Sequence, residues 1–127
     1  MKSLLLFLLL TTSAYPHGMN KPGPNNGHIR MIGTIHTELV MGKNSLEVYL
    51  LDVGFKNETV KNSNVEAFYL DKNQSSSQVK CTILESHFKC ALPIAIKNVQ
   101  QIRLRVVRDG YAPKEQAEYA LPLKFEN

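Results

Sequence analysis

Residues 34–53, TIHTELVMGKNSLEVYLLDV, decide the fold, because two apolar runs flank a short polar segment there. In the second run, apolar residues at every other position alternate with Glu47 and Tyr49, which is the period of a β-strand with one buried face. The first run, from Thr34 to Val40, has a similar alternating character. The segment between them, residues 41–45 (MGKNS), has the composition of a turn. The sequence therefore predicts a β-hairpin.

The chain from residue 28 onward repeats this pattern of short strands joined by turns. Further strands are predicted over residues 28–32, 65–70, 99–107 and 118–125, and in two short antiparallel arms beside the cysteines. Residues 55–64 and 71–77 are polar and are predicted to be loops. Seven to eight short strands without an amphipathic helix predict an all-β fold, an immunoglobulin-like β-sandwich over residues 28–127.

The first 14 residues are typical of a secretory signal peptide. Lys2 supplies the positive charge, residues 4–10 (LLLFLLL) the apolar stretch, and residues 12–14 (TSA) a cleavage site. The apolar stretch is shorter than the ~20 residues that a membrane-spanning helix needs. We therefore expect an exported protein, periplasmic or secreted, without a membrane anchor. Residues 15–27 are rich in Pro, Gly and Asn and are expected to form an extended arm ahead of the domain.

Cys81 and Cys90 are the only cysteines. In an oxidising compartment they are expected to form a disulfide with each other. The residues between them could form two antiparallel arms with a turn near residues 85–86, which would bring the two sulfur atoms together. The alternative is a pair of metal-binding thiolates with His87 beside them.

Histidine and methionine are concentrated near the N-terminus. Three of the four histidines, and every methionine except Met1, lie between residues 17 and 41. Imidazole nitrogen and thioether sulfur together suit a copper ion, Cu(I) or Cu(II), with methionine favouring Cu(I). The candidate metal ligands are His17, Met19, His28, Met31 and His36. The alternative is that Met31 and Met41 fill the core of a sheet, as methionine often does, and that the histidines are surface residues.

Strand periodicity limits which of these ligands can meet. In a strand over residues 34–40, His36 shares the polar face with Glu38 and is expected to be a surface ligand. His28 and Met31 are three residues apart, so they face opposite sides of a regular strand and cannot share one metal ion. His17 and Met19 lie on the arm and could fold over a site on the sheet.

Several short motifs carry a family resemblance. They are His17-Gly18, Gly23-Pro24, Gly27, TELV (residues 37–40) and VYLLD (residues 48–52). In this order they resemble a small β-sandwich domain found ahead of the periplasmic adaptor subunit of heavy-metal efflux systems of the RND type, and also as stand-alone exported proteins. The sequence departs from that family at Asn25, where Pro-His-Gly-Gly is usual.

The resemblance implies a periplasmic protein that binds copper or silver and holds it or passes it on. The partner would be a heavy-metal efflux assembly or a periplasmic metal acceptor. The alternative is a structural or protein-interaction module without metal, which presents a strand edge to a partner.

Other classes of function have little support in the sequence. Motifs of hydrolases, zinc peptidases and phosphate-binding loops are absent from the sequence, so an enzyme is not expected. The net charge is only +4 and tryptophan is absent, and basic residues are not interleaved with aromatic ones. Nucleic-acid binding is therefore not expected either.

Overall fold

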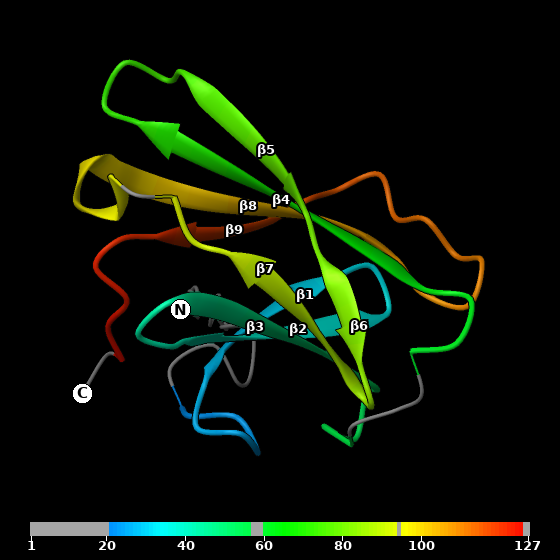
Figure 1. Cartoon of the computed structure of the whole chain (residues 1–127). Coiled ribbons are helices and arrows are strands. Elements are labelled where there is room, and N and C mark those ends of the chain that lie inside the picture. Colours follow the sequence, from blue (N-terminus) through cyan, green and yellow to red (C-terminus); the bar gives the residue numbers. More distant parts are fainter. Residues whose placement is uncertain (1–20, 57–59, 94, 126–127) are drawn as a thin grey trace, which may run out of the picture.

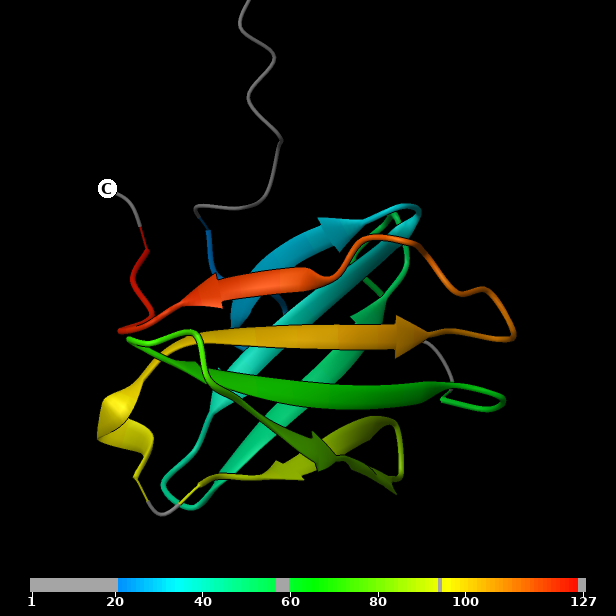
Figure 2. The ribbon, with the colours of Figure 1, turned by 90° about the horizontal axis from the view of Figure 1, so that it is seen from above.

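The computed structural model describes residues 21–56, 60–93 and 95–125. In these residues nine strands form two antiparallel sheets that pack face to face as a β-sandwich (Figures 1 and 2). The five-stranded sheet has the order β1-β2-β3-β7-β6, and the four-stranded sheet has the order β5-β4-β8-β9. The predicted all-β sandwich is therefore confirmed.

The five-stranded sheet is built around the predicted hairpin. Its strands are β1 (His28–Ile32), β2 (Ile35–Met41), β3 (Ser45–Leu51), β7 (His87–Ala91) and β6 (Thr82–Leu84). Strands β2 and β3 pair antiparallel, and a hydrogen bond from the Gly42 amide to the Ser45 carbonyl, 2.8 Å long, closes the turn. Local alternation and turn composition are sufficient to specify this hairpin.

The four-stranded sheet contains the one strand that the sequence pattern did not predict. Its strands are β5 (Ser76–Lys80), β4 (Asn64–Asp71), β8 (Val99–Val107, preceded by the 3-10 turn Ile96–Asn98) and β9 (Ala117–Ala120). The prediction of a loop over residues 71–77 was wrong at its end, because Ser76 and Ser77 pair with β4. Strand β5 is an exposed edge strand with little apolar character, so it has no clear hydrophobic period.

The core lies between the two sheets. Alternate residues of β2, β3, β4 and β8 point into it, as the strand period requires. The fully buried side chains of greatest volume there include Tyr119, Phe88, Ile35, Leu39, Leu46, Leu50, Ile102 and Leu104. Polar contacts also join the sheets. The Tyr119 hydroxyl donates to the Thr37 carbonyl oxygen at 3.0 Å and lies 2.6 Å from the Thr37 hydroxyl, and the Tyr69 hydroxyl donates to the Ala91 carbonyl oxygen at 2.7 Å. These contacts satisfy the hydroxyl groups of two large core side chains, Tyr119 and Tyr69.

The chain crosses from one sheet to the other between β5 and β6, at Cys81. Cys81 and Cys90 form a disulfide, with their Cα atoms 4.3 Å apart. The predicted pairing and the two antiparallel arms, β6 and β7, are confirmed. Both sulfur atoms are used in the bond, so the alternative of a thiolate metal site is wrong.

Candidate functional site

The outer face of the five-stranded sheet is the face that β2 turns away from the core. His36 and Glu38 lie on it, and both are buried, at 6% and 0% exposure. The prediction of a polar face for these residues is confirmed, but the prediction that His36 is a surface residue was wrong. The reason is that other segments of the chain lie over the face, beginning with residues 22–27.

The Glu38 carboxylate fixes residues 22–27, which we call the covering segment, to the sheet. Its Oε1 atom accepts hydrogen bonds from the backbone amides of Asn25 (2.8 Å) and Gly27 (2.9 Å). Its Oε2 atom accepts one from the Asn25 side-chain amide (2.9 Å). Hydrogen bonds to a carboxylate are among the stronger ones, and these satisfy donors that the packing removes from water.

Two glycines permit this close approach. A Cβ atom on Gly23 would overlap the Glu38 carboxylate, and one on Gly27 would lie 2.6 Å from the Leu39 carbonyl oxygen. The covering segment is closed by a hydrogen bond from the Gly23 amide to the Gly27 carbonyl, 2.9 Å long. The Gly23-Pro24 and Gly27 motif therefore has a steric reason in this chain.

His36 is held by a second loop, residues 52–56. Its Nδ1 atom lies 3.0 Å from the Asp52 carbonyl oxygen, and its ring lies 4.7 Å from that of Phe55. Phe55 has φ of 60°, an uncommon backbone conformation for an aromatic residue. The Asp52 side chain stabilises this turn by accepting hydrogen bonds from the amides of Gly54 (2.8 Å) and Lys56 (3.0 Å). The loop thus places an aromatic ring against His36.

Of the predicted ligands, the structure brings Met31 and His36 together. They are directly opposite one another in the β1–β2 register, so their side chains leave the sheet on the same face. Met31 is 54% exposed, in contrast to His36. The alternative that Met31 fills the core is therefore wrong.

His28 is not near this pair, as strand periodicity predicted. It is opposite Leu39, on the other face of the sheet, and its ring stacks on Phe125 with centroids 3.9 Å apart. Its Nε2 atom is buried and has no hydrogen-bond partner among the described residues. Burial, and secondarily the charge of Arg30, lower the pKa of His28 from 6.5. The ring therefore favours its neutral form, but it shares no site with Met31 or His36.

Met41, His17 and Met19 are the other histidine and methionine residues between positions 17 and 41. Met41 ends β2 opposite Leu46, on the core-facing side, and is 37% exposed. His17 and Met19 lie outside the described residues, as does the predicted signal peptide. Their role as ligands stays a prediction.

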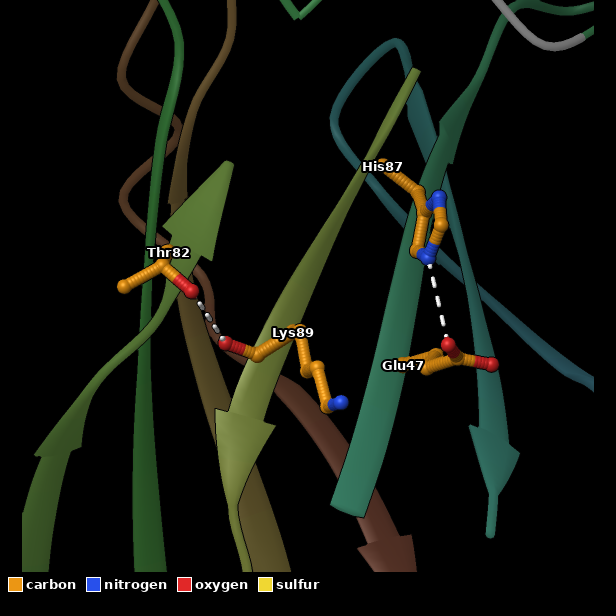
Figure 3. Close-up of polar contacts among 4 residues, drawn as sticks. All are labelled: Glu47, Thr82, His87 and Lys89. Atoms are coloured by element: carbon orange, nitrogen blue, oxygen red, sulfur yellow. Dashed lines mark hydrogen bonds and ion pairs between the residues drawn. The ribbon is translucent and has the colours of Figure 1, made fainter. Parts of the chain in front are cut away.

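A second polar group lies on the same outer face, across β3 and β7 (Figure 3). The His87 Nε2 atom is 3.3 Å from Glu47 Oε1. The His87 ring also stacks on that of Tyr49, with ring centroids 4.5 Å apart. Burial, followed by the charges of Glu47 and Glu38, raises the pKa of Tyr49. Beside this group, the Thr82 hydroxyl donates to the Lys89 carbonyl oxygen at 3.4 Å. The contacts with Glu47 and Tyr49 account for the position of His87 without a ligand.

Sequence reasoning missed the role of Glu38 and Phe55. Glu38 was predicted to lie on the polar face with His36, but not to bind residues 22–27, and Phe55 lay in a predicted loop. Within residues 21–56, 60–93 and 95–125, no group of three or more His, Cys, Asp or Glu side chains is arranged to hold a metal ion. Met31 and His36 would therefore form only part of a metal site.

Comparisons with known protein families, with curated proteins and with solved structures give no match. The part of the chain that the structure describes has no helix long and apolar enough to cross a membrane. The fold and site define a disulfide-bonded β-sandwich protein with a histidine and a methionine paired on a partly covered outer face.

Proposed function

We propose that this protein is an exported, non-catalytic carrier of Cu(I) or Ag(I), and that Met31 and His36 are two of its ligands. The observation that carries the proposal is the contact between His36 Nδ1 and the Asp52 carbonyl oxygen. A carbonyl oxygen only accepts, so in the neutral ring Nδ1 carries the proton and Nε2 carries the lone pair. Histidines that bind metals are commonly oriented in this way by a carbonyl on the other ring nitrogen.

Met31 supplies the soft ligand. Directly opposite residues of an antiparallel pair have Cβ atoms about 4.5–5.5 Å apart, a separation that two flexible side chains can close around one ion. Thioether sulfur selects Cu(I), and Ag(I) has similar ligand chemistry. The exposure of Met31 supports exchange of the ion with another protein.

His17 and Met19 are proposed to complete the site. They precede Lys21 by four and two residues, and four extended residues span at most about 14 Å. Lys21, Pro22 and Pro24 line a hollow of about 240 Å³ together with Ile29 and Phe55. Since the Phe55 ring also contacts His36, the start of the described chain lies near the proposed ligands. The acceptor is proposed to be a heavy-metal efflux assembly or a periplasmic metal-binding protein.

A competition titration with a Cu(I) chelator tests the proposal. The matched variants are Met31→Leu against Met41→Leu, and His36→Gln against His28→Gln. We expect Met31→Leu and His36→Gln to weaken binding at least about ten-fold, and the two controls to bind as the unchanged protein does. Circular dichroism checks that each variant is folded.

Two results would contradict the proposal. Equal affinities of the Met31→Leu and Met41→Leu variants would remove Met31 from the site. No Cu(I) or Ag(I) binding by the unchanged protein would leave the metal-free interaction module as the better description.

A further inference from the structure

A polar hollow lies on the outer face of the other sheet, away from the proposed metal ligands. Its volume is about 340 Å³, within the size range of small-molecule sites. It spans the sheet from β5 to the residue before β9. It is lined by Phe68, Leu70, Gln74, Ser76, Arg103 and Gln116.

Arg103 gives the hollow its charge. Its Nε atom is buried and has no hydrogen-bond partner among the described residues, although Glu118 Oε1 lies 3.3 Å away. The Glu118 carboxylate is shared with Gln101, whose side-chain amide donates to Oε2 at 3.3 Å. Glu118 therefore pairs with Arg103 on the Nε side, and the guanidinium group has two further nitrogens, Nη1 and Nη2, that can bind a carboxylate with two parallel hydrogen bonds.

Arg105 provides an internal contrast. It lies two residues further along the same strand, on the same face. Its guanidinium group is paired with the Glu66 carboxylate and lies 5.5 Å from the centre of the Phe68 ring. It is not among the residues that line the hollow. Of these two arginines, only Arg103 is placed to receive a ligand there.

The other polar groups of the hollow are neutral. The side-chain amides of Gln74 and Gln116 and the Ser76 hydroxyl each donate and accept hydrogen bonds. Hydroxyl groups of a ligand also do both, so these three side chains match a polyhydroxylated molecule. None of the lining residues is acidic. The Glu118 carboxylate beside Arg103 is outside this lining and is 56% exposed, so solvent screens its charge.

We infer that this hollow is a binding site for a sugar acid, whose carboxylate pairs with Arg103 and whose hydroxyls bond to Gln74, Ser76 and Gln116. Phe68 and Leu70 supply the apolar surface for the C–H groups of the sugar ring. The site is independent of the proposed metal ligands, since it lies on the opposite sheet.

Two-dimensional NMR of the disulfide-intact protein, titrated with glucuronate, tests this site. We expect saturable shifts of the side-chain amide signals of Gln74 and Gln116. Glucose lacks the carboxylate and acetate lacks the hydroxyls, so each is expected to bind at least about ten-fold more weakly than glucuronate.

Two matched arginine variants test whether Arg103 supplies the positive charge that binds the ligand carboxylate. Arg103→Gln is expected to weaken glucuronate binding at least about ten-fold, because charge-assisted hydrogen bonds are lost. Arg105→Gln, on the same face, is expected to stay within about two-fold of the unchanged protein. Gln116→Ala is a second variant that leaves both arginines in place, and its affinity for glucuronate is expected to be at least about three-fold weaker.

Three results would overturn the inference. They are shifts that do not saturate, equal affinity for acetate and glucuronate, and equal losses in the two arginine variants. Equal binding of acetate would mean a simple anion site.

Discussion

Glu38 and Glu66 occupy similar positions in the two sheets and have different surroundings. Each lies on an inner strand, β2 or β4, with its side chain on the outer face of its sheet. Glu38 is 0% exposed and binds three N–H groups of the covering segment. The Glu66 side chain is 18% exposed and is paired with the Arg105 guanidinium group of the neighbouring strand, whose side chain is 55% exposed.

The difference shows how a second layer changes what a polar residue does. On the four-stranded sheet, solvent screens the charges, and such pairs contribute little to stability. On the five-stranded sheet, the covering segment excludes water from the Glu38 carboxylate, so each buried donor depends on it. The outer face of the five-stranded sheet is thereby specified by a few hydrogen bonds, whereas loss of the Glu66–Arg105 pair on the other outer face is expected to cost less stability.

The largest expected effect comes from removing the Glu38 carboxylate. Glu38→Ala leaves the amides of Asn25 and Gly27 without their acceptor, and we expect it to lower the free energy of unfolding by about 2–4 kcal/mol. Urea unfolding followed by circular dichroism measures this. The matched control is Glu66→Ala, and a similar loss in both variants would contradict the contrast between the two faces.

A smaller loss is expected from filling the space above the carboxylate. In Gly23→Ala the new Cβ atom overlaps the Glu38 side chain, and overpacking of this kind costs about 1–3 kcal/mol. Gly110→Ala is a control for the glycine change itself, because no atom lies within 4 Å of a Cβ there, although its φ of 80° is unfavourable for alanine. The double variant Gly23→Ala, Glu38→Ala is expected to lose less stability than the sum of the two single losses, because both substitutions affect the same contact between residues 23 and 38.

The pH dependence of stability tests the cover that Phe125 makes over His28. Because folding lowers the pKa of His28 from 6.5, the unfolded chain binds more protons than the folded one between that value and the lower folded pKa. The contribution of His28 to the free energy of unfolding is therefore fully present above pH 6.5, and it is lost as the pH falls from 6.5 through the lower folded pKa. We expect the free energy of unfolding of the His28→Gln variant to change less between pH 7.5 and pH 5 than that of the unchanged protein. An unchanged pH dependence in the variant would contradict this.

The smallest effect is expected for the pair on the open face. A double-mutant cycle of Glu66→Gln and Arg105→Gln should give a coupling below about 1 kcal/mol that decreases further in high salt. Urea unfolding at two salt concentrations measures it. A coupling as large as the loss in Glu38→Ala would remove the distinction between the two faces.

Much of the fold could be predicted because its signals are local. Alternation in residues 34–53 was enough to place β2, the turn and β3, and two cysteines allow only one internal disulfide. Two errors have a common cause. Strand β5 has no apolar alternation, and the strand predicted over residues 118–125 ends at Ala120, before the cis Leu121–Pro122 bond. In both places tertiary pairing, which local pattern does not report, decides where a strand begins or ends.

The candidate site was predicted only in part. The separation of His28 from Met31 followed from the two-residue period of a strand. The pairing of Met31 with His36 required the register of β1 on β2, and the burial of His36 required the loop that carries Phe55. Composition alone carries no information on the strand register or on which loop covers His36.

By itself, the sequence determined that the chain forms an all-β sandwich with its hairpin and its disulfide. Hydrophobic alternation is visible within short stretches of sequence, and two cysteines allow only one pairing. Only the tertiary structure decided which outer face is covered. That outcome depends on contacts between residues far apart in the chain, such as Asn25 and Glu38, which are separated by 13 positions. Burial is a property of what packs over a residue, and the packing partner is set by the whole fold.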